Sequence, residues 1–171
     1  MDNRKLELVT DFYEFTMSNG YFAKNMNNVN AYFDVFFREI PDGGGYVIFA
    51  GLEQIIEYIQ NLHFDEEDII YLKNTNKFSN DFLNYLKNFK FSGDIWSVPE
   101  GTVVFPTEPL ITVKAPLIEA QLLETMLLLL INHQSLIATK ASRIVSAAKG
   151  RPVMEFGARR AHSIDAAVYG A

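Results

Sequence analysis

The sequence predicts an α/β fold, in which an N-terminal part of mixed helices and strands leads into the start of a larger α/β domain. Three observations support this prediction. Strand-like aromatic runs and amphipathic helical patterns fill the first 92 residues. Three short β runs, separated by turns that contain proline, occupy residues 93–115. The last 55 residues read as a helix, a short strand and another helix, an order typical of a parallel sheet or an α/β barrel.

The first elements follow from local residue patterns. Thr10 or Asp11 is expected to cap a first helix, and Glu14 stands at the capping-box distance from Asp11. Residues 30–40 are aromatic and β-branched with partial alternation, which predicts a strand. The segment PDGGG that follows predicts a turn, and YVIFAG a second, short buried strand.

Three helices are expected next. Apolar residues at positions 52, 55, 56, 59 and 62 form one helical stripe, which predicts a helix over residues 52–62. Two shorter helices are expected from residues 65 and 79 onwards, because Asp65 and Ser79 are good N-caps.

Residues 117–149 form one long helical pattern, apolar on nearly every side between Leu122 and Ile131, which predicts burial on most faces. One straight helix of this length would extend about 50 Å, so a break is expected near Asn132 and His133. A strand over residues 153–156 and a final helix complete the pattern.

These elements predict two domains. Residues 1–116 form an N-terminal sheet-and-helix domain with a β-rich module at 93–115, and residues 117–171 form the long helix and the start of a barrel domain. A closed α/β barrel takes about 250 residues. We therefore expect the chain to be the front part of a larger protein, with its barrel domain truncated.

Composition excludes several classes of function. The chain has 171 residues, a net charge of −6 and no cysteine. It therefore has neither the basic face that non-specific nucleic-acid binding requires nor any disulfide or thiolate site. The N-terminus is not a secretory signal, and the longest apolar run, residues 126–131, is far shorter than the ~20 residues that span a bilayer. We expect a cytoplasmic protein that does not bind membranes.

Charged side chains gather near the end of the chain, in EFGARRAHSIDAA. If residues 153–156 form a parallel strand, Arg159 and Arg160 lie at its C-terminal end, where α/β proteins bind ligands. Guanidinium groups match phosphate or carboxylate. The alternative is structural: both arginines pair with Glu155, Asp165 or a barrel neighbour.

The other candidates also have a structural alternative. His162 could be a general acid or base, a hydrogen-bond donor to phosphate, or a structural hydrogen-bond partner. His63 is expected at the surface, and His133 as a hydrogen-bonded core residue; the three histidines have no metal-ligand spacing, so no metal site of protein ligands is expected. Tyr13 and Tyr21 could be core aromatics. The PDGGGY segment lacks the residues of a phosphate-binding P-loop, so a simple turn is expected there.

Four segments resemble the N-terminal part of nicotinate phosphoribosyltransferases. They are LVTDFYEFTMSNGYF, GDIWSVPEGTVVFPTEPLITV, EAQLLETMLLLLINHQSLIATKASRI and PVMEFGARRAH. They occur in the order of the family and cover essentially the whole chain. Two departures are visible: Ser163 follows RRAH where many family members have glycine, and family members are more than twice as long.

The resemblance implies the type II phosphoribosyltransferase architecture, here incomplete, and an enzyme of NAD biosynthesis. Such enzymes join nicotinate to 5-phosphoribosyl 1-pyrophosphate with coupled ATP hydrolysis, require Mg²⁺, and form active sites at a homodimer interface. The histidine that the family phosphorylates has its place beyond Ala171, so no catalytic residue is expected within the chain and the 171 residues alone are expected to be inactive. Two alternatives remain: a non-catalytic fragment or partner subunit, and a relative that acts on nicotinamide or quinolinate.

The resemblance also implies roles for individual residues. Tyr13 would stack on the pyridine ring from the neighbouring subunit, Phe156 would pack on the other face of that ring, and Arg159 would hold substrate phosphate. The π faces of both rings would favour the pyridinium cation that forms when the ring nitrogen attacks the sugar. Other residues expected to line the substrate site are Gly157, Arg160 and His162.

Overall fold

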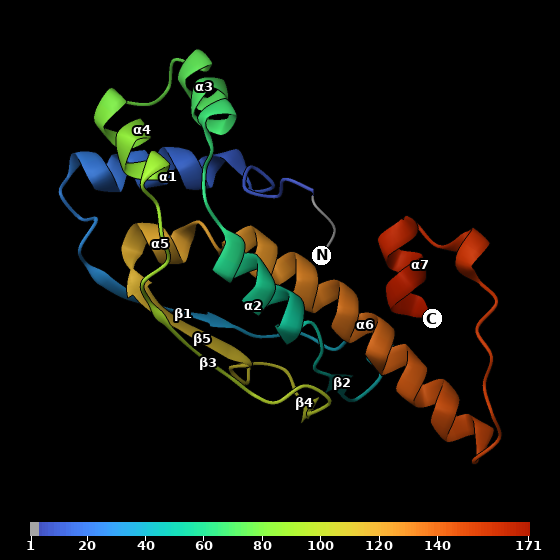
Figure 1. Ribbon diagram of the computed structural model, residues 1–171. Helices are drawn as coiled ribbons and strands as arrows, with labels where there is room; N and C mark the ends of the chain where they lie inside the picture. Colours follow the sequence, from blue (N-terminus) through green and yellow to red (C-terminus); the bar gives the residue numbers. More distant parts are fainter. Residues whose placement is uncertain (1–3) are drawn as a thin grey trace.

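An antiparallel three-stranded sheet forms one side of the molecule, and helices cover its inner face (Figure 1). The structure, a computed structural model, describes residues 4–171. The strand order is β1 (Asn30–Val35), β5 (Ile111–Pro116) and β3 (Asp94–Ser97). A second, two-stranded sheet pairs β2 (Val47–Ile48) with β4 (Val103–Val104). The three predicted β runs at 93–115 are thus confirmed: β4 and β5 pair with strands from residues 30–48, and β3 pairs with β5.

The two faces of the three-stranded sheet differ in character. Ile111, Val113 and Ala115 alternate along β5 and are buried against the helices. The intervening positions face outward with those of the neighbouring strands, where Tyr32 and Trp96 are more than half exposed. Alternation with a period of two is what a sheet with one buried face requires.

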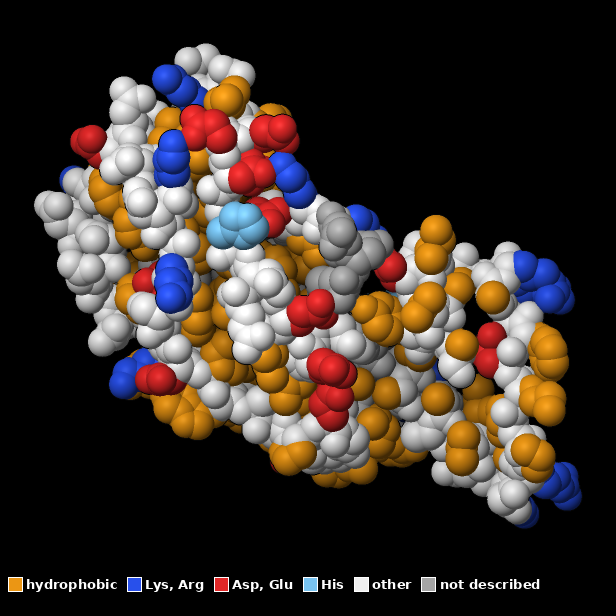
Figure 2. Space-filling model, viewed as in Figure 1, with side chains coloured by type: hydrophobic (Ala, Val, Ile, Leu, Met, Phe, Trp, Pro, Cys, Tyr) orange, Lys and Arg blue, Asp and Glu red, His pale blue; other side chains and the backbone are white. Residues whose placement is uncertain are grey.

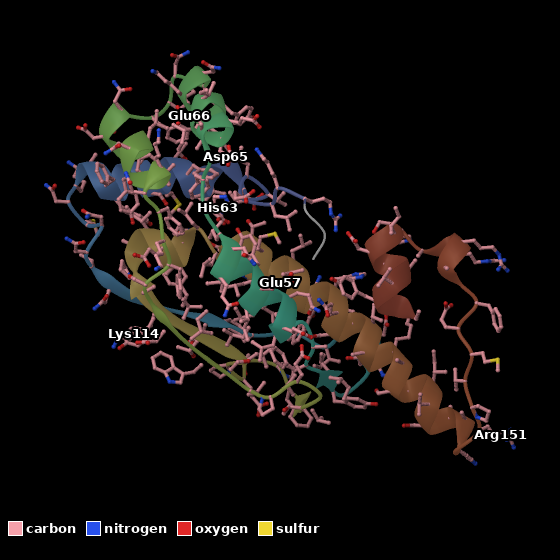
Figure 3. All side chains as sticks on the ribbon, viewed as in Figure 1. Glu57, His63, Asp65, Glu66, Lys114 and Arg151 are labelled. Atoms are coloured by element: carbon pink, nitrogen blue, oxygen red, sulfur yellow. The ribbon has the colours of Figure 1, made fainter. Side chains whose placement is uncertain are left out.

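Four helices pack in the N-terminal part. They are α1 (Phe12–Ala23), α2 (Leu52–Asn61), α3 (Glu66–Asn74) and α4 (Asn80–Lys87), with a short 3₁₀ turn, η1 (Pro41–Gly43). Both predicted caps are confirmed: Asp65 accepts from two backbone N–H groups at the start of α3, and the Ser79 hydroxyl accepts from Phe82 N–H at 3.2 Å. Figure 3 labels Asp65 and Glu66 at the start of α3.

The predicted cap of α1 is wrong. Asp11 does occupy the N-cap position, but its side chain makes no capping hydrogen bond. The reason is that Glu14, which the capping box would turn back toward Asp11, is fully buried. The Glu14 carboxylate instead accepts from the hydroxyls of Thr10 and Thr125.

The long helical pattern breaks early rather than in the middle. It divides into α5 (Leu117–Gln121) and α6 (Glu124–Ala148), and the turn between them is tightened by Leu123 N–H, which donates to the Ala120 carbonyl three residues back. The predicted break near Asn132 and His133 is wrong.

The middle of α6 stays straight because it is held against the β2 segment. The Ser135 hydroxyl accepts from Ala50 N–H at 3.1 Å, and the Thr139 hydroxyl accepts from Ile48 N–H at 2.8 Å. These hydroxyls satisfy backbone donors that would otherwise be buried. Regular α-helical geometry brings both residues, four positions apart, to the same face.

The outer side of α6 is more exposed than the sequence predicts. Leu128 and Leu129 are about half exposed, whereas Met126, Leu127 and Ile131 are buried. By length and apolar composition the span Leu117–Ala148 could cross a membrane, although core helices of soluble proteins meet the same criterion.

After α6 the chain runs back along that helix as an extended segment. It ends in a 3₁₀ turn, η2 (Ala158–Arg160), and in α7 (Ile164–Gly170) (Figure 1). The Ser163 hydroxyl caps α7 by accepting a 3.2 Å hydrogen bond from Ala166 N–H. The predicted strand over residues 153–156 is wrong. The physical reason is that within residues 4–171 no neighbouring strand pairs with this segment.

Candidate functional site

Tyr13 lies in the first turn of α1 and is 45 % exposed, so its interpretation as a core aromatic is wrong. Its hydroxyl donates to Glu124 Oε1 at 3.0 Å, and Gln121 Nε2 donates to the other oxygen of Glu124 at 2.8 Å. Loss of hydration and the bond to Glu124 raise the pKa of Tyr13 to about 12. The phenol is therefore a neutral donor at physiological pH. Tyr21, by contrast, packs against the core.

A second polar contact lies directly beside this one. Thr125 accepts from Asp11 N–H at 3.1 Å and donates to Glu14 at 2.6 Å. Burial raises the pKa of the Glu14 carboxyl, and the hydrogen bonds from the two threonine hydroxyls oppose that rise. The start of α1 is thus fixed to the start of α6 by two consecutive residues, Glu124 and Thr125.

These residues border a hollow of about 410 Å³ between β1 and the start of α6. It is mainly apolar, and Arg38 is the cationic residue among those that line it. Sequence reasoning missed both Glu124 and Arg38. Two features of the sequence could have pointed to them. Glu124 is an acidic residue in the first turn of a buried helix, and Arg38 directly follows the aromatic pair FF. The lining residues are Asp11, Val35, Phe36, Phe37, Arg38, Leu110, Glu124, Thr125, Leu128, Leu129, Ile131 and Asn132.

The C-terminal candidates lie on the extended segment and η2. Phe156 is 74 % exposed, and Arg159 Nη1 donates to its carbonyl at 3.0 Å. The predicted alternative, ion pairs with Glu155 or Asp165, is wrong: Glu155 accepts from Gly157 N–H. Asp165 pairs with Arg4 at 2.7 and 2.9 Å. No ion pair of Arg159 or Arg160 is present within residues 4–171.

A larger groove, of about 1040 Å³, separates α6 from this C-terminal segment. Figure 2 shows openings between the two, on the right of the view. Among the predicted site residues, Gly157, Arg160 and His162 line the groove. Tyr13, Phe156 and Arg159 are not among its lining residues, although Arg159 and Phe156 are neighbours. The structure thus groups the C-terminal candidates but keeps Tyr13 apart from them.

The remaining two histidines have different environments. His63 is at the surface, as predicted, with Nδ1 2.6 Å from the Asn61 carbonyl oxygen. His133 is wrongly predicted as a hydrogen-bonded group, since its buried Nε2 has no partner among the described residues and its ring packs edge-on against Tyr169. In the described part of the chain no three histidine, cysteine or acidic residues come close enough together to hold a metal ion.

Comparison with known proteins identifies the family. Residues 8–132 match the model of the nicotinate phosphoribosyltransferase N-terminal domain. The chain belongs to the nicotinate phosphoribosyltransferase family. A nicotinate phosphoribosyltransferase of Mycobacterium tuberculosis is 50 % identical over 160 residues, which are 94 % of this chain and 34 % of that protein. One of Bacillus subtilis is 45 % identical over 166 residues, or 97 % and 34 % of the two chains.

Solved structures agree with the fold. The crystal structure of human nicotinic acid phosphoribosyltransferase matches with a TM-score of 0.83 at 32 % identity, over 94 % of this chain and 34 % of that one. A nicotinate-nucleotide pyrophosphorylase from Pyrococcus furiosus has a TM-score of 0.73 at 23 % identity, over 99 % and 39 %, which supports the fold alone. The predicted fold class, the type II phosphoribosyltransferase architecture, is confirmed. The chain spans about a third of the length of these relatives.

Proposed function

We propose that the protein is a nicotinate phosphoribosyltransferase of NAD biosynthesis, to which this chain contributes the N-terminal part of the fold and part of the substrate site. The observation that supports this most strongly is the 45–50 % identity, across nearly the whole chain, to relatives that carry this name. Two further facts agree with it: Tyr13 and Phe156 present exposed rings, and Arg159 has no acidic partner among the described residues.

In the proposed reaction the pyridine nitrogen of nicotinate attacks the anomeric carbon of 5-phosphoribosyl 1-pyrophosphate. A bond from nitrogen to carbon forms, the bond from carbon to pyrophosphate oxygen breaks, and its electron pair leaves with pyrophosphate. The ring gains positive charge during this step. Aromatic faces of Tyr13 and Phe156 on the two sides of the ring would favour that charge more than the neutral substrate, and such a difference raises the rate of the chemical step.

The arginines would serve the anionic groups of the substrates. Arg159 is proposed to hold phosphate, since its guanidinium is exposed beside Phe156. Gly157, Arg160 and His162 would form the wall of the site, as they line one groove. Mg²⁺ and ATP remain part of the proposal. The described residues do not fit a protein-held metal site, so the phosphates of the substrates would carry any Mg²⁺ that takes part.

We further propose a cytoplasmic homodimer with shared active sites. Tyr13 does not line the groove that contains Gly157, Arg160 and His162, so a second copy could supply one of the two groups. Several apolar side chains near the groove are also at least half exposed, as expected of a surface that another protein surface covers. They are Ile144, Val145, Met154, Phe156, Ile164 and Val168.

The test measures turnover by two purified proteins. One is the 171 residues alone, and the other is the complete protein, where the reading frame continues past Ala171. Nicotinate, nicotinamide and quinolinate are offered in turn with 5-phosphoribosyl 1-pyrophosphate, ATP and Mg²⁺, and the mononucleotide and pyrophosphate are quantified. We expect turnover of nicotinate by the complete product and none by the 171 residues. Turnover of nicotinamide or quinolinate in preference to nicotinate would refute the proposal.

A further inference from the structure

We propose that Glu124 is a positioning residue for substrate binding, which holds the ring of Tyr13 in the orientation needed to stack on the pyridine ring. The inference rests on the proposed function for its effect on catalysis, but the contact itself is a feature of this chain. Glu124 does not reach the substrate in this proposal. It acts through the hydroxyl of Tyr13, whose bond to Glu124 Oε1 is 3.0 Å long.

Tyr13 needs such support because little else restrains it. It lies in the first turn of α1, its side chain is 45 % exposed, and no ring–ring contact holds it among the described aromatic pairs. A half-exposed tyrosine is free to change its χ1 rotamer unless its hydroxyl is fixed. A ring used as a stacking platform loses affinity when it must be ordered at the moment of binding.

Glu124 is itself well fixed. It is the first residue of α6, and its second carboxylate oxygen accepts from Gln121 Nε2 at 2.8 Å. The next residue, Thr125, binds Asp11 N–H and the buried Glu14, so the backbone of α1 cannot move away from α6 without breaking those bonds. The carboxylate thus connects a half-exposed ring to a helix junction that several hydrogen bonds hold together.

The charge of Glu124 also matters. Its bond to the phenol contributes to the raised pKa of Tyr13, and the protonated hydroxyl donates to the Glu124 carboxylate. A phenol that donates to a carboxylate carries more electron density in its ring than a free phenol does. Such a ring is a better partner for a pyridinium cation, and the benefit grows as the charge develops.

The experiment uses the complete enzyme and a double-mutant cycle. Glu124→Ala should raise KM for nicotinate about fivefold to tenfold and lower kcat, with KM for 5-phosphoribosyl 1-pyrophosphate changed by less than about twofold. Glu124→Gln, which keeps the size and one acceptor but not the charge, should recover most of the loss in KM and less of the loss in kcat. In a Tyr13→Phe background, Glu124→Ala should have almost no further effect. Glu66→Ala, which removes an exposed ion pair with Lys87, is the matched control and should leave KM unchanged.

The proposal is overturned if Glu124→Ala raises KM for nicotinate by the same factor in the wild-type protein and in the Tyr13→Phe background. Equal changes in both KM values would do the same, because they indicate general damage to the fold. If the complete protein does not turn over nicotinate at all, the proposed function fails.

The positioning contact can then be tested without activity, by fluorine NMR of protein labelled with meta-fluorotyrosine. The Tyr13 signal is assigned by its loss in Tyr13→Phe. Glu124→Ala should shift or broaden that signal. An unchanged signal would refute the contact.

Discussion

Replacing Thr125 by valine should destabilise the protein, because its hydroxyl serves a buried carboxylate. Thr125 donates to Glu14 at 2.6 Å, and Glu14 is fully buried. Valine has the same shape but cannot donate, so the carboxylate keeps only the bond from Thr10. A hydrogen bond to a charged group contributes about 1.5–3 kcal/mol. The other contact of Thr125, from Asp11 N–H, is exposed to water and adds little.

We therefore expect Thr125→Val to lower the free energy of unfolding by about 2 kcal/mol at neutral pH. For a chain of this size that corresponds to a fall in Tm of roughly 4–8 °C. Thr112→Val is the matched control. Its hydroxyl also donates to a carboxylate, Asp34, at 2.6 Å, but this pair is exposed on the sheet. The control should change the free energy of unfolding by less than about 0.5 kcal/mol.

The effect of Thr125→Val on the free energy of unfolding should depend on pH, because Glu14 titrates. Burial raises the pKa of Glu14 in the folded state above its ordinary value of 4.5. Between the unfolded and folded pKa values the folded protein binds more protons, so this group lowers stability as pH rises through that window. Thr125→Val removes a bond that favours the ionised form, which raises the pKa further and extends the window upward.

The loss of stability in Thr125→Val should therefore be larger near pH 7 than near pH 4, where Glu14 is mostly protonated in both proteins. Urea denaturation followed by circular dichroism at the two pH values measures the difference. Glu14→Gln, which cannot titrate, should flatten the pH profile in this range. A loss of equal size at both pH values, or no loss at all, would show that the Glu14 carboxylate does not depend on Thr125.

Three further predictions concern backbone and caps. Ser79→Ala should cost about 1 kcal/mol in urea denaturation, since it removes the hydroxyl cap of α4, and Ser79→Asp should restore it. The hydrogen bond from Lys5 lowers the pKa of Asp65 to about 2. Asp65 therefore contributes stability that is present above its ordinary pKa of 3.8 and is lost as pH falls toward 2. In an acid titration, Asp65→Asn should lack this loss of stability between pH 3.8 and 2. Gly51→Ala should lower the free energy of unfolding by about 1–3 kcal/mol, measured by thermal denaturation. Gly51 has φ of +111°, and a Cβ there would lie 3.1 Å from the Leu130 carbonyl oxygen. An unchanged Tm would contradict this prediction.

The sequence predicted best those elements that depend on neighbouring residues. The helices α2, α3 and α4, and the caps Asp65 and Ser79, were predicted because each depends on contacts within one or two turns. Even there tertiary packing changed the detail. Tyr58 is buried on α2 and Ile56 is about half exposed, although the apolar stripe placed Ile56 inside.

Contacts between distant segments could not be predicted in this way. The predicted capping box of α1 does not form because the Glu14 carboxylate binds Thr125 instead of turning back to Asp11. Thr125 lies 111 residues from Glu14 in the sequence. The continuity of α6 past His133 likewise depends on hydroxyls that bind the β2 segment, 85 and 91 residues away. Glu124 belongs to the same class, because an acidic residue at the start of a helix has many possible roles and only the fold brings it to Tyr13.

The C-terminal segment shows how a residue pattern can predict a strand that this chain alone does not form. Residues 153–156 are apolar and suit a strand, but a strand is stabilised by hydrogen bonds to its neighbours, and within residues 4–171 none lies beside it. Arg159 and Phe156 nevertheless stay adjacent, because the bond from Arg159 to the Phe156 carbonyl is local. The geometry inside the EFGARR motif is therefore set by the motif itself. Its position relative to Tyr13 depends on contacts outside the motif, and a pattern of neighbouring residues therefore could not predict how the candidate residues of the two segments lie relative to one another.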